Sequence, residues 1–170
     1  LKMIENIDKP ALSALWPNKK GMSVVLDLGA NIECNSKNLV DFSIMGASLY
    51  KSLYPNNTPK IALLNIGSEE LKGNEIIKET FQILNEKKFK NFDFSGYIEG
   101  NQLMDGNVNV IISDGFTGNV ALKTAEGTAN FITDELKMIF KGSILGKISA
   151  ILNYSNLNKF KKRLDPRLYN

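Results

Sequence analysis

Residues 108–128 read VNVIISDGFTGNVALKTAEGT, in which a short apolar run leads through a loop rich in Gly, Asn and acid into a segment of helical period. Ordering such a loop has a high conformational entropy cost for a simple turn, because glycine loses more backbone freedom on folding than any other residue. Gly115 and Gly118 would let the backbone approach a ligand, and the amides that open the next helix would face it with the positive end of the helix dipole. This stretch therefore predicts a strand, an anion-binding loop that suits phosphate, and a helix; ordinary turn and cap chemistry is the alternative.

Three further apolar runs alternate with helical segments in the same way. The runs 22–28, 60–66 and 91–98 predict strands that are mostly too continuous to be buried on one face only. Apolar residues at helical spacing predict helices around 39–53, 77–84 and 122–139. This alternation favours an α/β fold, a three-layer sandwich with helices on both faces of a largely parallel sheet.

Loops after parallel strands are the places to look for a ligand, since such sheets bind ligands at the carboxyl ends of their strands. The loop after the first run is DLGAN, with Asp27 and Asn31, and the loop after the second is NIGSEELKGNE, with Lys72. EGN follows the third run and SDGFTGN the fourth. Four such loops in a row favour one polar site at the sheet edge, to which Lys72 would bring a positive charge; a solvated loop lysine is the plainer interpretation.

The composition removes several classes of site. The chain has no His and a single Cys, Cys34, which excludes an internal disulfide, a four-cysteine metal site and nucleophile–histidine couples. A lone cysteine is more often a small apolar filler than a reactive thiol. GSILGKI at 142–148 has one spacer too few and no hydroxyl for a Walker loop, and no GxGxxG follows a strand. We therefore expect no metal, no dinucleotide and no other cofactor.

The positive charge is concentrated near the carboxyl end. Residues 134–170 hold eight basic and three acidic side chains, whereas residues 1–133 hold 13 basic and 15 acidic ones. We expect a core of residues 1–133 and a basic amphipathic helical hairpin at 134–170. Within it Leu145, Ile148 and Leu152 share a stripe too short to span a bilayer but able to lie on an anionic one, and a dimer-interface helix is the alternative. The first residue is Leu1, there is no signal-peptide pattern, and we expect a piece of a longer protein.

Several motifs together resemble one known family. LDLGAN, IMGASLY, LLNIG with KGNE, and DGFTGNVALKT with AEGTA are similar, in this order and spacing, to the PlsX family of bacterial phosphate acyltransferases. The resemblance implies that inorganic phosphate attacks the acyl thioester of acyl carrier protein, giving acyl phosphate for phospholipid synthesis. It also implies a fold like that of isocitrate and isopropylmalate dehydrogenases and phosphotransacetylases, a homodimer, and a cytoplasmic protein held peripherally on the membrane. No nucleic acid is implied as a partner.

The resemblance assigns the catalytic roles to two residues. Lys72 of KGNE would supply charge to phosphate or to the oxyanion, and Asn119 of GFTGN would donate a hydrogen bond. A second group is expected to shape the loops or face phosphate: Asp27, Asn31, Gly73, Asn74, Asp114, Gly115 and Gly118. Two other classes stay open at this point. They are a dehydrogenase of the same fold and a non-catalytic module that binds carrier protein or membrane.

Overall fold

A computed structural model describes residues 8–164, which form two compact units that divide between Ala121 and Leu122. The expected division after residue 133 falls inside one long helix, α3 (Gly115–Lys141), so the units divide 12 residues earlier than the sequence suggested. The reason lies in burial: within α3 only Gly115 and Gly118 are buried, both in its first turn.

The first unit is built on a five-stranded sheet of order β1-β2-β5-β3-β4. Its strands are β1 (Ser13–Asn18), β2 (Gly21–Leu26), β3 (Lys60–Asn65), β4 (Asp93–Glu99) and β5 (Val110–Ile112). The pairs β2–β5, β5–β3 and β3–β4 are parallel, and only β1, a hairpin partner of β2, is antiparallel. The predicted strands and the largely parallel sheet are confirmed; β1 was not predicted.

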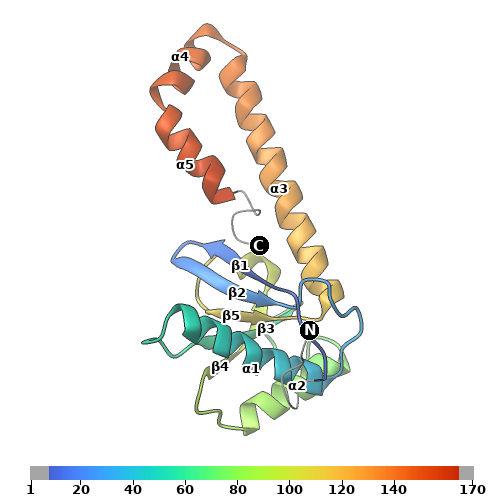
Figure 1. The fold of residues 1–170 in the computed structure, drawn as a ribbon. Coiled ribbons are helices and arrows are strands. Elements are labelled where there is room, and N and C mark those ends of the chain that lie inside the picture. The colour runs from blue at the N-terminus through green and yellow to red at the C-terminus, as the bar shows by residue number, and fades with distance from the viewer. Residues whose placement is uncertain (1–7, 165–170) are drawn as a thin grey trace. The chain divides into compact units, whose positions relative to one another are not determined.

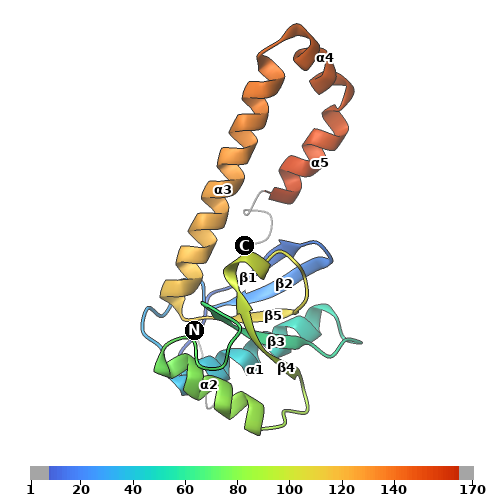
Figure 2. The ribbon, with the colours of Figure 1, turned by 180° about the vertical axis from the view of Figure 1, so that it is seen from behind.

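Two helices cover one face of this sheet, where they lie side by side beneath it (Figures 1 and 2). α1 (Ser36–Leu53) packs on β2 and β5, and α2 (Glu75–Glu86) packs on β3 and β4. Their buried residues, among them Phe42 and Leu84, form one cluster with alternate residues of three strands: Val24, Leu26, Ile61, Leu63, Val110 and Ile112. The fold is α/β as predicted, although α1 and α2 share a single face.

A glycine allows α1 to approach the sheet. Gly46 lies over β2 and β5, and a Cβ built there would lie 2.5 Å from Cγ1 of Val110 and 2.9 Å from Cδ1 of Leu26. The amino end of α1 is fixed by a capping box, in which Asn35 and Asn38 exchange side-chain to backbone hydrogen bonds. The position of α1 in turn fixes the loop that precedes it, between β2 and Asn35.

The second unit is helical. It contains most of α3, then α4 (Ile144–Leu152) and α5 (Tyr154–Leu164). Ser143 caps α4 by accepting a hydrogen bond from the N–H of Gly146 at 2.9 Å, so the Walker-like GSILGKI is a helix start. None of residues 122–162 is buried. Within the described residues, no helix has the length and apolar character that crossing a membrane requires.

Candidate functional site

Asp27 organises the loop that follows β2. Its side chain is wholly buried, and its carboxylate accepts hydrogen bonds from the backbone N–H groups of Leu12, Gly29, Ala30 and Asn31 at 2.7 to 3.2 Å. The side-chain amide of Asn31 donates a fifth, at 2.7 Å. A buried carboxylate is tolerated only when it is satisfied in this way. Asp27 therefore shapes the loop.

Asn31 joins this loop to the start of α3. Its side-chain amide donates to Asp27 and to the backbone oxygen of Pro10, the latter at 2.6 Å. Its own backbone oxygen accepts a hydrogen bond from the N–H of Gly115 at 2.8 Å. The loops after β2 and β5 are thus held together by direct contacts.

The two glycines of GFTGN make this junction possible. A Cβ built on Gly115 would lie 2.6 Å from the backbone oxygen of Asn31, and one on Gly118 would collide with the backbone oxygen of Asp27. Asp114 caps the helix by accepting hydrogen bonds from the N–H and the hydroxyl of Thr117, both at 2.8 Å. The glycines thus let α3 pack on the β2 loop, a requirement that the sequence analysis did not foresee; their expected contact with phosphate stays a prediction.

Asn119 is an exposed polar side chain at this junction. It lies against Gly29, where a Cβ would be 3.6 Å from Cβ and Cγ of Asn119. Gly29 has a φ of +131°, a conformation that favours glycine. Among the described residues, none forms a hydrogen bond with the Asn119 side chain. Its amide is therefore free to donate to a ligand.

A second asparagine, Asn65, organises the loop after β3. Asn65 is 9% exposed, and its amide donates to the backbone oxygens of Gly67 at 3.1 Å and Lys72 at 2.9 Å. Gly73 has a φ of +100°, and a Cβ there would lie 2.5 Å from Oδ1 of Asn65. Asn65 thus fixes the backbone on both sides of Lys72. The sequence analysis missed this role, for which the signal is an amide that ends the apolar strand KIALLN.

Lys72 itself is held only at the surface. Its side chain is 52% exposed, and Nζ lies 3.1 Å from Oε1 of Glu69. The pKa of the Glu69 carboxyl is lowered, mainly by a hydrogen bond from the backbone N–H of Glu69 and next by the hydrogen bond from Lys72. Exposed ion pairs of this kind are weak. Lys72 can therefore exchange Glu69 for another anion.

A groove of about 490 Å³ is lined by residues of the loop after β2 and of the first turns of α2 and α3. Its polar lining includes Asn74 and Asp114, and its apolar lining includes Cys34, Leu39 and Phe116. Neither Lys72 nor Asn119 lines it. Asn74 also caps α2 by accepting a hydrogen bond from the N–H of Ile77 at 2.9 Å. Burial raises the pKa of the Cys34 thiol, in line with its role as an apolar filler.

The sheet order explains why these loops meet. Strands β2, β5 and β3 are neighbours and parallel, so the loops that follow them leave the same edge of the sheet. Direct contacts unite Asp27, Asn31, Gly115, Gly118 and Asn119 in one cluster, and Lys72 and Gly73 in another around Asn65. The edge thus carries an exchangeable cation, Lys72, and the exposed amides of Asn119 and Asn101, which have no hydrogen-bond partner among the described residues. Within residues 8–164 no group of three or more Asp, Glu or Cys side chains could hold a metal ion.

The predicted membrane-contact residues lie on α4. Leu145 and Leu152 are 79% and 80% exposed, and Ile148 is 49% exposed. In solution this exposure is costly, which makes the stripe a candidate contact surface.

Comparisons with known proteins give the chain a family. A family model described as "Fatty acid synthesis protein" matches residues 1–170. The "Phosphate acyltransferase" of Pelagibacter ubique is 77% identical over 170 residues, which are all of this chain and 51% of that protein. The protein of the same name from Paramagnetospirillum magneticum is 44% identical over all of this chain and 48% of its own length. The chain thus spans about half the length of the curated relatives it matches.

A solved structure supports the fold. The EutD phosphotransacetylase from Staphylococcus aureus matches with a TM-score of 0.55 at 15% identity, over 75% of this chain and 44% of that one. At this identity the likeness concerns the fold alone. The family follows from the sequence matches: the chain belongs to the fatty acid synthesis protein family, together with these phosphate acyltransferases.

Proposed function

We propose that the protein of which this chain forms a part is a phosphate acyltransferase, converting acyl-[acyl carrier protein] and inorganic phosphate to acyl phosphate and free carrier protein. The observation that carries the proposal is the pairing of β3 with β5, because it brings the loops of Lys72 and Asn119 to one sheet edge. The names of the 77% and 44% identical relatives support the same reaction. The acyl phosphate would serve phospholipid synthesis.

The chemistry needs little from the protein beyond position and charge. A phosphate oxygen attacks the thioester carbonyl carbon, and the carbonyl oxygen becomes an oxyanion. The oxyanion then collapses, the carbon–sulfur bond breaks, and the carrier leaves as a thiolate that takes up a proton. A thiolate is already a fair leaving group, so no covalent enzyme intermediate is needed. The rate is governed by how well phosphate is held and how well the oxyanion is stabilised.

Lys72 and Asn119 suit these two tasks. Lys72 can leave its exposed pair with Glu69 and place its charge on phosphate. Asn119 has no hydrogen-bond partner among the described residues, and its amide can donate to the developing oxyanion. Asp27, Asn31 and Asn65 position these two groups by fixing their loops. Asp114 and Glu33 place negative charge at the groove, which favours a neutral part of the thioester there over phosphate.

In this proposal the second unit contacts the membrane and the partner subunit. The stripe of Leu145, Ile148 and Leu152 rests on an anionic membrane surface, which makes the protein peripheral to the membrane on the cytoplasmic side. A homodimer forms through the outer face of α3, where Phe131, Ile132, Met138 and Ile139 are exposed. Ile132, Leu136 and Ile139 follow one another at spacings of four and three residues, as in helices that pair along a seam.

The test is turnover of acyl carrier protein thioester with inorganic phosphate by the full-length protein. Lys72→Ala and Asn119→Ala should each lower turnover by roughly a hundredfold, the scale for losing one preorganised donor. Lys72→Ala should also raise the KM for phosphate. The matched controls are Lys78→Ala and Asn85→Ala on the surface of α2, which should stay within about twofold of wild type. Near-normal turnover in both site variants would refute the assignment and favour a non-catalytic module.

A further inference from the structure

The groove beside the candidate site has a buried floor and exposed apolar walls. Its volume is about 490 Å³, which lies within the range of small-molecule sites, roughly 300 to 1,000 Å³. Its floor consists of buried side chains, namely Cys34, Leu39 and Ile77. Its apolar walls are exposed side chains, namely Ile32, Ile76 and Phe116. All six residues belong to the first unit, so the groove is built without α4 and α5.

The polar side chains of this groove are engaged in helix caps. Asn74 accepts a hydrogen bond from the backbone N–H of Ile77 at 2.9 Å. Asp114 accepts two hydrogen bonds from Thr117, one from its N–H and one from its hydroxyl, both at 2.8 Å. The surface that is left for a ligand is therefore mainly apolar, and contact of such surface with water is unfavourable.

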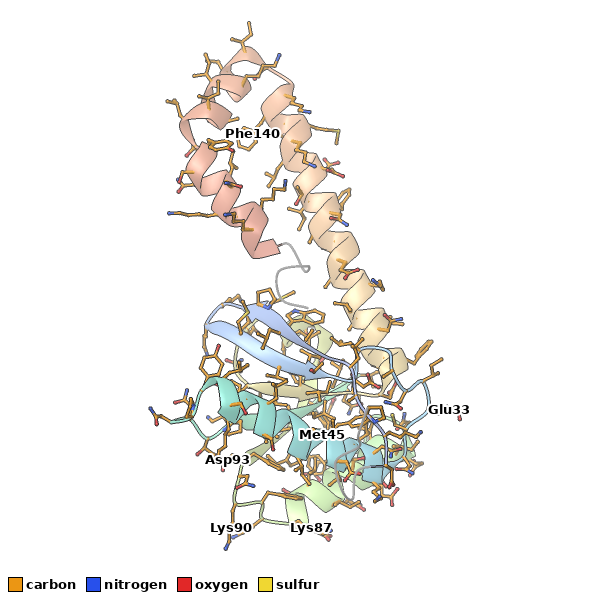
Figure 3. All side chains as sticks on the ribbon, in the orientation of Figure 1. Glu33, Met45, Lys87, Lys90, Asp93 and Phe140 are labelled. Carbon is orange, nitrogen blue, oxygen red and sulfur yellow. The ribbon has the colours of Figure 1, made fainter. Side chains whose placement is uncertain are left out.

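The charge of the groove disfavours an anionic occupant. Among the described residues that line it, Glu33 and Asp114 are acidic and none is basic. Lys9 reaches the rim, where its ammonium group donates a hydrogen bond to the backbone oxygen of Glu33 at 2.8 Å. The side chain of Glu33 projects outward from the loop after β2 (Figure 3). A phosphate or carboxylate head group is therefore a poor occupant, whereas a neutral apolar chain meets no such penalty.

The groove begins next to both proposed catalytic residues. Phe116 precedes Asn119 by three residues in α3, so their side chains lie about 60° apart on one face of the helix. On the other side, Asn74 follows Lys72 by two residues. A thioester whose carbonyl oxygen is bound by Asn119 would therefore have its acyl chain within one helical turn of Phe116.

We infer that this groove binds the acyl chain of the thioester substrate, and that Ile76, Phe116 and Cys34 set the chain length that the site accepts. The inference rests on the proposed function and names the part of the substrate that the groove takes. The chain enters past Phe116, lies against Ile76 and ends at the floor beside Cys34. An acyl chain suits these walls because it is neutral, apolar and needs no hydrogen-bond partner.

Unreactive conjugates of acyl carrier protein test the groove separately from turnover. The probes are carrier proteins whose thiol bears an octyl, dodecyl or hexadecyl group as a thioether, and calorimetry gives the affinity of the full-length protein for each. Every methylene that enters the groove should tighten binding by up to roughly fourfold, and the gain should stop at the length that fills the groove. The change of affinity with chain length is the readout, because altered docking of the carrier affects all lengths equally.

Ile76→Glu should reduce the gain in affinity from the octyl to the dodecyl conjugate by roughly tenfold or more, because it places a charge against the chain. The matched control is Ile44→Glu on α1, which should keep the wild-type gain: Ile76 and Ile44 are 37% and 40% exposed, and Ile44 does not line the groove. Phe116→Ala should reduce the gain without adding a charge. Cys34→Met should end the gain at a shorter chain, because it raises the floor.

Two results would overturn the inference. The same gain with chain length in Ile76→Glu, Phe116→Ala and wild type would place the acyl chain elsewhere. A lower melting temperature in Ile76→Glu but not in Ile44→Glu would mean that another segment of the full-length protein, or its partner subunit, fills the groove. Failure of the proposed function has a different signature, since wild type would then not turn over dodecanoyl carrier protein, while the thioether titrations would still report whether the groove binds the chain.

Discussion

Gly118→Ala offers the sharpest test of how the candidate site is built, because two effects of opposite sign compete. Replacing a helical glycine by alanine ordinarily stabilises a protein by about 0.8 to 1 kcal/mol. At Gly118, however, the added Cβ would collide with the backbone oxygen of Asp27 and lie 2.6 Å from Oγ of Ser113. Overpacking costs about 1 to 3 kcal/mol, and a backbone atom cannot rotate away, so the upper part of that range applies. We expect a net loss of about 1 to 2 kcal/mol.

Gly127→Ala is the matched control in the same helix. Nothing lies within 4 Å of a Cβ at Gly127, so only the helix propensity changes and the variant should gain about 0.5 to 1 kcal/mol. Chemical denaturation of the two variants should separate them by about 2 kcal/mol. Gly118→Ala should also lower turnover, because Asn119 is the next residue. If both variants were equally stable, the packing of α3 on the Asp27 loop described above would be wrong.

Three further predictions concern other parts of the chain. Asn65→Ala should lower turnover at least tenfold and raise the KM for phosphate, because the substitution frees the backbone around Lys72. Asn85→Ala serves as the control, and an unchanged KM in Asn65→Ala would show that Asn65 does not position Lys72. Chelators should leave turnover unchanged, and a loss restored by a divalent cation would favour the dehydrogenase-like alternative. The wild-type protein should sediment with anionic vesicles, and high salt should weaken this binding. Ile148→Glu should not sediment, whereas Leu53→Glu on α1 should behave as wild type. Equal sedimentation of all three proteins would show that the α4 stripe is not the anchor.

The parts of the fold that follow from sequence are those with a strong local pattern. The continuous apolar runs became β2, β3, β4 and β5 within a few residues of their predicted bounds. Strand β1 was missed because it is an edge strand that ends in a Pro17–Asn18 pair, and proline weakens any strand pattern. The sheet order was also out of reach, since the placement of β5 between β2 and β3 depends on contacts far apart in the chain.

The boundary between the units shows a similar limit. Residues 122–139 have apolar side chains at helical spacing, which is typical of a helix packed on a core, and they were assigned in part to the first unit. None of those side chains is buried, and only the first two turns of α3 belong to the first unit. A periodic pattern predicts the helix but does not say what covers its apolar face.

At the candidate site, the sequence located the loops but could not assign the role of each polar residue. The carboxylate and amide side chains of Asp27, Asn31 and Asn65 could bind a ligand, yet they form their hydrogen bonds within the loops that they shape. Asn119 differs from them only in being exposed and without a partner among the described residues, and Lys72 only in having a weak, exposed one. A polar group can serve a ligand when binding does not leave a buried partner unsatisfied, which costs about 1 to 3 kcal/mol. Since this condition concerns partners and not residue type, it requires the folded chain. Lys72 and Asn119 meet it, as does Asn101 after β4, so it is the family resemblance that favours the first two.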